Sequence, residues 1–401
     1  MKITSIETIR VGWYPRPVWV QVHTDEGLVG LGETTVSPAA AEAVIHHDLA
    51  EYLMGKDPLD VTSHHAEMMR RLRTWRTRDA ATQAISAVDI ALWDIAGQAK
   101  GEPIHRMLGG KARDQIRIYN TCASPAYAVR QGTSTTEISR PGTGSGNEPI
   151  QDDLQAFLTD AGTLAESLLA EGITAMKIWP FDQFAPESNG QMITNVQLEA
   201  AVEPFRKIRE AVGNRMEIAA ELHSLWSVPA AIRIAKALEP FTPIWIEDAV
   251  HPSNVDALAQ VTAVTNIPVA ASELLATREA YRDLFDHGGV RVCMLDVTWV
   301  GGLTEARAVA SMAQAAKLPV TPHDCTGPVN LMAGLHLSIH APNTMVQETV
   351  RSFNSEVYPR IVDRMPRIEN GFAFAPDEPG LGMALKPEFL GAEDTVIQRT
   401  A

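Results

Sequence analysis

The sequence reads EIAAEL at residues 217–222, IWIED at 244–248 and VAASE at 269–273, three short hydrophobic runs that each carry a glutamate at or beside the end. A segment rich in Ala, Leu and Glu follows each run, which is the pattern of repeated strand–helix units. The three glutamates, Glu221, Glu247 and Glu273, are spaced by 26 residues, which is one strand–helix period. Consecutive parallel strands would therefore bring all three to the same end of one sheet.

The same pattern continues on both sides of this stretch. Eight runs can be counted, namely the three above and IRIYNTC from residue 116, AMKIW from 175, VCMLD from 292, PVTPH from 319 and MVQET from 345. Segments with good helical patterns separate several of them, at 152–171, 195–212, 228–239 and 303–317. Eight such units have the size of a closed parallel barrel. The predicted fold class is α/β, with a (β/α)8-type barrel over residues 114–370.

Residues 1–113 have a different pattern and are predicted to form an α+β unit before the barrel. Runs at 3–11, 17–23 and 28–32 are joined by short turns, which predicts an antiparallel meander. Residues 81–101 show an apolar stripe at helical spacing and end in glycine. Histidine pairs in this unit, at 46–47 and 64–65, point in different directions on a helix and are interpreted as solvated.

The composition argues against several classes of protein. Of 401 residues, 34 are Lys or Arg and 49 are Asp or Glu, so the net charge of −15 disfavours binding to nucleic acid or to an anionic membrane. The three cysteines form no CxxC pair, which disfavours a disulfide framework or a thiolate zinc site. No apolar window reaches the roughly 18 residues of a membrane span, and no signal-peptide core is present. The expected location is the cytoplasm.

Polar residues end most of the predicted strands, where barrel enzymes carry their catalytic groups. Three carboxylates on neighbouring strands would repel one another and raise one another's pKa values, so a cation is the simplest resolution. Ligands that offer only oxygen favour a hard ion, Mg2+ before Mn2+ and well before zinc. Glu221, Glu247 and Glu273 are therefore the predicted metal ligands.

Asp296 and His323 end the sixth and seventh strands, so their side chains are predicted to be neighbours. A carboxylate that accepts from one imidazole nitrogen orients the ring, which makes His323 a candidate general base or acid. His223 lies two residues after Glu221, on the same side of the strand, and is a second candidate acid. Lys177 ends the second strand, where it could bind a substrate carboxylate, abstract a proton or point to solvent.

Taken together, these residues resemble the enolase superfamily, and within it the mandelate racemase-like branch. The likeness extends over nearly the whole chain and includes TDEGLVGLGE from residue 24, AVDIALWDIAGQAKGEPIHRMLGG from 87, VGGLTEA from 300 and GLG from 380. It implies that residues 1–113 are a capping domain over the barrel mouth, to which residues 371–401 return. It also implies Mg2+ at the three glutamates, and Glu348 matches the family's acid that hydrogen-bonds the substrate carboxylate.

The superfamily shares a partial reaction in which a base removes the proton α to a carboxylate and the metal stabilises the enediolate. Racemases of this branch carry Lys-x-Lys on the second strand, and here Trp179 stands in place of the second lysine, one of two opposed bases. Dehydration needs only a base and an acid. The resemblance therefore implies a carbon–oxygen lyase that converts a six-carbon aldonate to a 2-keto-3-deoxy sugar acid, with His323 and Asp296 as the base pair and His223 as the acid.

Two alternatives stay open, an epimerase or racemase that uses Lys177 and His323, and a non-catalytic barrel protein. The branch usually has Asp where this chain has Glu221, which leaves the metal geometry open. Residues 124–149 are polar and are predicted to form an active-site loop, and Trp13 and Tyr14 correspond to a specificity loop of the family. The expected partners are a small sugar-acid substrate and further copies of the chain in a homo-oligomer, with no nucleic acid and no membrane.

Overall fold

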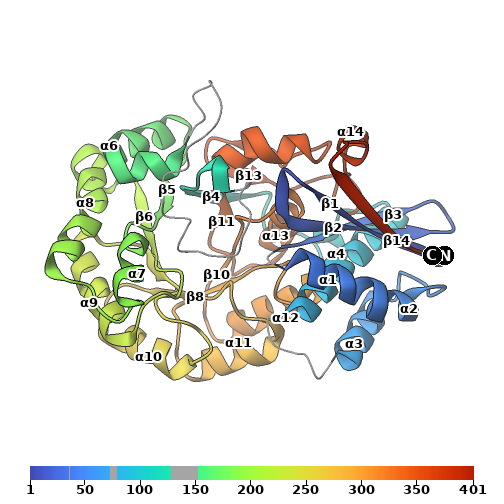
Figure 1. Cartoon of the computed structure of the whole chain (residues 1–401), viewed down its shortest axis with the longest axis horizontal. Helices are drawn as coiled ribbons and strands as arrows, with labels where there is room; N and C mark the ends of the chain where they lie inside the picture. The colour runs from blue at the N-terminus through green and yellow to red at the C-terminus, as the bar shows by residue number, and fades with distance from the viewer. Residues whose placement is uncertain (36, 73–78, 128–151) are drawn as a thin grey trace.

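A computed structural model describes residues 1–35, 37–72, 79–127 and 152–401 of the chain. It contains a sheet with helices, built mainly from N-terminal residues, beside a closed barrel that is ringed by helices (Figure 1). The predicted fold class, a (β/α)8-type barrel with an N-terminal α+β capping domain, is confirmed. None of the helices in these described ranges has both the length and the apolar character that crossing a membrane requires.

The capping domain is built on a four-stranded antiparallel sheet with the order β14-β1-β2-β3. Its strands are β1 (Ile3–Val11), β2 (Tyr14–Thr24), β3 (Val29–Thr34) and β14 (Thr395–Thr400). The predicted meander is therefore present, and a strand from the C-terminal region extends it at β1. The helices of this part are α1 (Pro38–Val44), α2 (Ala50–Leu53), α3 (Val61–Arg71), α4 (Ala80–Lys100) and α5 (Ile104–Met107).

Eight parallel strands form the barrel, and each matches one of the eight predicted runs. They are β4 (Gln115–Thr121), β5 (Ala175–Ile178), β6 (Glu217–Glu221), β7 (Trp245–Glu247), β8 (Val269–Ala271), β9 (Val292–Leu295), β10 (Val320–Pro322) and β11 (Gln347–Thr349). Consecutive strands pair from β4 to β10, and β11 pairs with β4. Met345 N–H donates to the Val320 carbonyl, which joins the segment before β11 to β10 and completes the ring.

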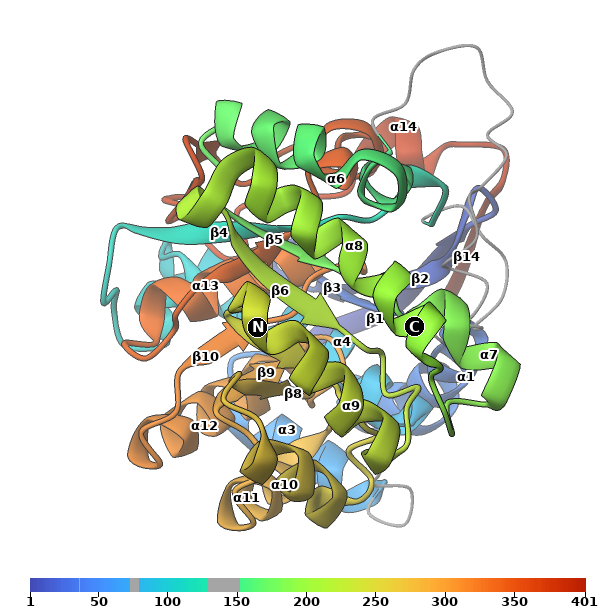
Figure 2. The same cartoon turned by 90° about the vertical axis from the view of Figure 1, so that its left-hand side faces the viewer.

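The crossover helices surround the strands, and Figure 2 shows α6, α8, α9 and α10 following one another around the outside. The helices are α6 (Asp153–Ala170), α7 (Ala185–Ser188), α8 (Asn195–Val212), α9 (Val228–Leu238), α10 (Val255–Val264), α11 (Thr277–Asp286), α12 (Gly302–Ala315) and α13 (Pro328–His340), with α14 (Pro387–Leu390) after the barrel. The four helices predicted between strands correspond to α6, α8, α9 and α12. The boundaries of these helices agree closely with the prediction.

Side chains fill the interior of the barrel beneath the strand ends. The buried cluster consists of Tyr119, Ala175, Ala219, Trp245, Ala270, Val292, Met294 and Val346. The rings of Tyr119 and Trp245 meet edge to face, with centroids 5.2 Å apart. Trp245 Nε1–H donates to Glu247 Oε2 at 3.0 Å, so the packed interior also supports one of the predicted site residues.

Helix α4 lies between the capping sheet and the barrel. Asp79 accepts hydrogen bonds from two backbone N–H groups of its first turn, and Gly101 ends the helix in the left-handed conformation. Most of its residues are buried because it packs against both β3 and α12. On β3, a Cβ at Gly32 would lie 1.8 Å from the carbonyl oxygen of Ala87, so only glycine permits this close approach.

Glu33 on β3 ties the capping domain to the barrel helix α13. Its buried carboxylate accepts hydrogen bonds from Trp19 Nε1 at 2.7 Å and from the backbone N–H groups of Asn330 at 3.2 Å and Val329 at 3.4 Å. Burial raises the pKa of Glu33 to about 8, while these donors oppose the shift. The contact therefore joins two sheet strands of the capping domain to the first turn of a barrel helix.

Substitution Glu33→Ala should lower the free energy of unfolding by about 2–4 kcal/mol, because it leaves the Trp19 N–H and the first turn of α13 without their acceptor. Chemical denaturation followed by circular dichroism measures this loss. Glu388→Ala, at an exposed glutamate of α14, is the control and should change stability by less than about 0.5 kcal/mol. Equal effects of the two substitutions would contradict this prediction.

Three of the four paired histidines are buried, so the interpretation that they are solvated is wrong. His46, His64 and His65 are 7%, 4% and 4% exposed. His46 lies 2.8 Å from both Thr8 Oγ1 and Thr400 Oγ1. His65 Nε2 lies 3.0 Å from the carbonyl oxygen of Gly301 in the barrel. The error arose because both helical segments pack against other parts of the fold. The turn that carries His46 meets β1 and β14, and α3, which carries His64 and His65, packs against α4.

His336 of α13 is fully buried against His105 of α5. Its Nδ1 accepts from the His105 backbone N–H at 3.2 Å, and its Nε2 lies 3.1 Å from the carbonyl oxygen of Leu381. The two rings stack with centroids 5.5 Å apart. Burial lowers the pKa of His336 to about 3, and the neighbouring His105 adds to this effect.

The protein should therefore lose stability as the pH falls from about 6.5 toward 3. In that window the unfolded chain binds a proton at the His336 imidazole and the folded chain does not, so acid favours the unfolded state. His336→Asn removes the titrating group and should make the stability–pH curve shallower, by up to about 4 kcal/mol across the window. Urea denaturation of both proteins at several pH values measures the curves, and parallel curves would contradict the assignment.

After the barrel, β12 (Ile368–Glu369) and β13 (Phe372–Phe374) form a hairpin, and β13 pairs antiparallel with β4. The predicted boundary between residues 370 and 371 falls inside this hairpin. The chain then reaches the capping sheet through β14. The domain limits 1–113, 114–370 and 371–401 stay predictions.

Candidate active site

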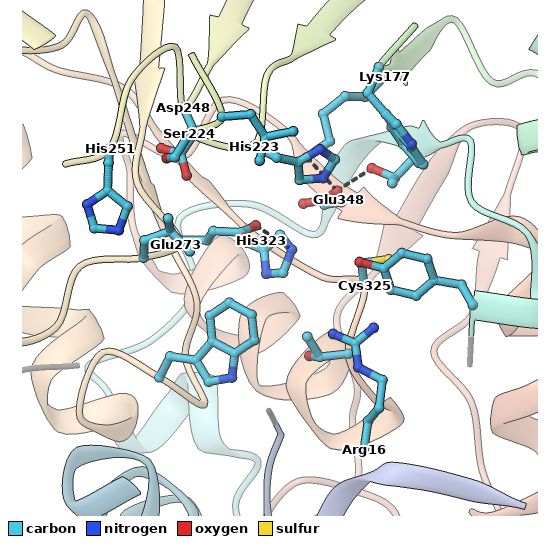
Figure 3. Close-up of a pocket in the computed structure, with 17 residues that line it drawn as sticks. Arg16, Lys177, His223, Ser224, Asp248, His251, Glu273, His323, Cys325 and Glu348 are labelled. Atoms are coloured by element: carbon cyan, nitrogen blue, oxygen red, sulfur yellow. Dashed lines mark hydrogen bonds and ion pairs between the residues drawn. The ribbon is translucent and has the colours of Figure 1, made fainter. Parts of the chain in front are cut away.

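A pocket of about 370 Å³ lies at the carboxyl ends of the barrel strands, beneath the capping domain (Figure 3). Lys177, His223, Glu273, His323 and Glu348, all predicted from the sequence, line it. The other predicted site residues, Glu221, Glu247 and Asp296, are buried at the ends of neighbouring strands or directly after them. The fold therefore brings all the predicted site residues to one end of the barrel.

Lys177, on β5, lies among carboxylates. Its Nζ atom is 2.6 Å from Glu247, 3.0 Å from Glu348 and 3.2 Å from Glu221. The side chain is 3% exposed, so it does not point to solvent. Burial alone would lower the pKa of Lys177, but the charges of Glu247 and Glu348 raise it well above its usual value. An ammonium held in this way can bind an anion, but it does not accept a proton near neutral pH.

Glu221 and Glu247 lie opposite each other on the paired strands β6 and β7. Glu221 Oε1 accepts from the backbone N–H groups of Leu222 at 3.1 Å and His223 at 2.8 Å. Burial and the neighbouring charge of Glu221 raise the pKa of Glu247 well above its usual value. Two buried carboxyl groups this close retain a proton between them unless further positive charge is supplied.

Glu273 follows β8 and is engaged with an imidazole. Its Oε2 atom lies 2.7 Å from Nε2 of His323. Within the described part of the chain, no set of three His, Cys, Asp or Glu side chains is arranged to hold a metal as it stands. The three predicted ligands therefore share one end of the barrel. Lys177 forms ion pairs with Glu221 and Glu247, and His323 contacts Glu273.

His323 directly follows β10 and forms the predicted pair with Asp296. Its Nδ1 lies 2.7 Å from Asp296 Oδ2, which also accepts from Asn330 Nδ2 at 2.9 Å. Asp296 Oδ1 accepts from the N–H and the hydroxyl of Thr298. Burial would lower the pKa of His323, but the charge of Glu273 and its other carboxylate contacts raise it well above its usual value. The carboxylate thus fixes the orientation of the ring.

His223 belongs to a second imidazole–carboxylate pair, which was missed in the sequence. Its Nδ1 lies 2.6 Å from Oδ2 of the fully buried Asp182, which begins a short 3-10 turn (Asp182–Phe184) after β5. Burial opposes the charge on His223, but Asp182 raises the pKa of His223 to about 9. An aspartate shortly after a predicted strand end was the available signal. Because β6 and β10 are four strands apart in a ring of eight, His223 and His323 lie on opposite walls of the pocket.

The backbone after β6 and β7 adopts the left-handed conformation at residues other than glycine. The φ angles are 46° at His223, 59° at Ser224 and 43° at Asp248. Ser224 N–H donates to the carbonyl oxygen of Asp248 at 2.7 Å, which links the two turns. Such conformations cluster at functional sites, and here they accompany the turn that places His223 in the pocket wall.

Glu348, on β11, forms an ion pair with Lys177 and accepts a hydrogen bond from the segment that follows β10. It accepts from the Thr121 hydroxyl and, through Oε2, from the backbone N–H of Asp324 at 3.0 Å. Both oxygens of Glu348 thus have donors, and Lys177 stands between this carboxylate and the Glu221–Glu247 pair. The cluster is rigidly placed because every member comes from a strand.

The capping domain contributes a different residue from those predicted. Trp13 is covered by Arg360, whose guanidinium carbon lies 3.8 Å from the ring centroid, and Tyr14 is buried. Arg16, further along β2, lines the pocket instead. Most of the predicted loop at 124–149 lies outside the described residues, apart from a short turn at Pro125–Tyr127.

Sequence models of two domains match most of the chain. One describes the N-terminal domain of mandelate racemase / muconate lactonizing enzyme and matches residues 4–109, and the other describes the enolase C-terminal domain-like family and matches residues 160–389. The chain belongs to the mandelate racemase / muconate lactonizing enzyme family. The resemblance to the mandelate racemase-like branch of the enolase superfamily is thereby confirmed.

Relatives of this family member cover its full length. The D-galactonate dehydratase of Ralstonia pickettii is 30% identical over 100% of this chain and 94% of the relative, and that of Pectobacterium atrosepticum is 29% identical with the same coverage. A solved enolase of the mandelate racemase subgroup from Agrobacterium tumefaciens is 42% identical, with a TM-score of 0.88 and coverage of 100% and 99%. The predicted enzyme class, a carbon–oxygen lyase of the hydro-lyase type acting on a small molecule, is confirmed, and the homo-oligomer stays a prediction.

Proposed function

We propose that this enzyme dehydrates a six-carbon sugar acid, an aldonate, to a 2-keto-3-deoxy sugar acid with Mg2+ as cofactor. The observation that carries the proposal is the pair of imidazole–carboxylate couples, His323–Asp296 and His223–Asp182, on opposite walls of one pocket. Elimination of water needs one group that takes a proton and another that gives one, and this arrangement supplies both. The names of the D-galactonate dehydratase relatives support a sugar acid as the substrate.

The donor atoms fit a hard divalent ion. Carboxylates outnumber cations around the pocket even when Arg16 is counted. The described residues include the carboxylates Glu221, Glu247, Glu273, Glu348, Asp182 and Asp296 and the cations Lys177, His223, His323 and Arg16. This excess of buried negative charge and the all-oxygen donors favour Mg2+ held by Glu221, Glu247 and Glu273. Bound Mg2+ would supply positive charge to the substrate carboxylate while the enediolate forms.

The protein side chains take the following roles in this proposal. Lys177, supported by Glu348, binds the substrate carboxylate as a fixed ammonium. Nε2 of His323 removes the α-proton, since Nδ1 is held by Asp296. This requires the contact between His323 and Glu273 to open when substrate binds, which also removes the carboxylate charge that contributes most to the raised pKa of His323. His223, charged through its contact with Asp182, gives a proton to the departing β-hydroxyl. The proton and the hydroxyl would leave from opposite faces of the substrate.

Racemisation is less well supported by the same geometry. It needs two bases on opposite faces of one carbon, and Lys177 is held protonated by three carboxylates. The position of the second lysine is Trp179, whose ring lies edge-on to His223 with centroids 5.6 Å apart. This apolar ring cannot exchange a proton with substrate.

A panel of six-carbon sugar acids, assayed for keto acid with semicarbazide, tests the proposal. At least one member should give keto acid with Mg2+, and EDTA should reduce the rate at least about 100-fold, because the developing charge loses several kcal/mol of stabilisation. Restoring Mg2+ should restore the rate. Keto-acid formation that is indifferent to EDTA would exclude the metal, and the absence of keto acid from every member would exclude dehydration.

A further inference from the structure

Arg16 reaches the pocket from the capping domain. Tyr14 at the start of β2 is anchored to the barrel, because its hydroxyl donates to the carbonyl oxygen of Thr326 at 2.6 Å. Residues two apart on a strand point to the same side, so Arg16 is directed toward the same barrel loop. Its side chain lines the pocket together with Cys325 and Thr326, and Figure 3 shows it on the opposite side of the pocket from Lys177.

The charge on Arg16 is not balanced by the protein groups that the structure describes. Lys177, His223 and His323 each contact at least one carboxylate. Arg16 instead lies over the ring of Tyr127, with its guanidinium carbon 4.7 Å from the centroid, and forms no ion pair with a carboxylate in the described ranges. A guanidinium remains charged at all accessible pH values. Arg16 is half-buried, and an anionic group on a ligand would balance its charge.

We propose that Arg16 binds an anionic group at the end of the sugar acid remote from the reacting carboxylate. This inference rests on the proposed function, in which Lys177 holds the reacting carboxylate across the pocket. The remote group would be the second carboxylate of an aldarate or a phosphate on the terminal hydroxyl of an aldonate, since a guanidinium binds either with two parallel hydrogen bonds. The preferred substrate is then a dianion, and the simple aldonate is a poorer substrate of the same reaction.

The expected discrimination follows from the strength of a charged hydrogen bond. Such a bond is worth roughly a 10- to 100-fold difference in kcat/KM between the dianion and the aldonate that carries a terminal hydroxymethyl group. Arg16→Met should remove this preference, because kcat/KM should fall by a larger factor for the dianion than for the aldonate. Arg16→Lys keeps the positive charge but lacks the planar guanidinium that forms two parallel hydrogen bonds. This variant should therefore retain part of the preference for the dianion.

The experiment compares the wild type, Arg16→Met, Arg16→Lys and the control Arg360→Met on matched sets of aldonate, aldarate and 6-phosphoaldonate. Arg360 is an exposed arginine of the same region that packs on Trp13, and its substitution should leave the preference unchanged. Turnover is measured with semicarbazide, and the affinity of each acid is measured by isothermal titration calorimetry with and without Mg2+. Comparison of the aldarate with the phosphorylated acid identifies which anion is recognised.

The outcomes separate the two proposals. A preference for one dianion that disappears in Arg16→Met supports the role of Arg16, whether it is seen in turnover or in affinity alone. Equal kcat/KM and equal affinity of the wild type for aldonate and dianions would overturn that role and leave the dehydratase proposal standing. An equal decrease in kcat/KM and affinity for aldonate and dianions in both Arg16 variants would also overturn the role of Arg16 in binding the remote anion. Dianion binding without turnover of any acid would support Arg16 and contradict the proposed reaction.

Discussion

Replacement of His323 by asparagine should lower the rate of dehydration about 10²- to 10⁴-fold, because the group assigned to remove the α-proton is lost. The substitution should also abolish exchange of the α-proton with solvent, since both events share the same first step. Turnover of a sugar acid identified from the panel measures the first effect. Incorporation of deuterium from D2O into recovered substrate, followed by NMR, measures the second.

The control for this variant is His287→Asn, at an exposed histidine after α11, which should keep both activities. Thermal unfolding should show that His323→Asn remains folded, because asparagine can still hydrogen-bond Asp296. Persistent α-proton exchange in His323→Asn would assign the base to another residue. Inversion at the α-carbon of the wild type, with deuterium incorporated and no keto acid, would instead establish an epimerase.

Replacement of His223 by asparagine should give the complementary result. Dehydration should again fall about 10²- to 10⁴-fold, because the β-hydroxyl loses its proton donor. Exchange of the α-proton should persist, since His323 and Asp296 on the opposite wall are unchanged. The same NMR and semicarbazide measurements on one sample separate the two steps.

The ratio of exchange to dehydration is the quantity that decides the role of His223. In the wild type, proton removal is followed by loss of water, and in His223→Asn the enediolate should return to substrate instead. Loss of both activities in parallel would place His223 in the first step or in substrate binding. Retention of dehydration would exclude His223 as the acid.

Much of the barrel could be predicted because its determinants are local in the sequence. Each strand is a short hydrophobic run, and the residue at its end, such as Glu247 or His323, occupies the catalytic end by the geometry of a parallel barrel. The 26-residue spacing of Glu221, Glu247 and Glu273 therefore predicted that all three lie at the carboxyl ends of neighbouring strands. The fold class followed from these repeats, and the enzyme class followed from the resemblance of the surrounding motifs to the enolase superfamily.

The parts that could not be predicted depend on contacts between distant segments. Asp182 lies in a short 3-10 turn between β5 and α7, and its contact with His223 depends on how this connection folds back toward the neighbouring strand β6. Arg16 comes from a capping strand whose direction is fixed by a hydrogen bond to the barrel, 312 residues away in the sequence. The engagement of Lys177 with three carboxylates is also a property of packing, since lysine at a strand end is compatible with several environments.

In the described part of the chain, the packed interior of the barrel leaves no channel through the ring of strands. Tyr119 and Trp245 meet edge to face inside the barrel, and smaller buried side chains such as Ala219 and Ala270 pack around them. Small molecules therefore enter and leave at the carboxyl ends of the strands, where the pocket lies, and not through the filled interior of the barrel.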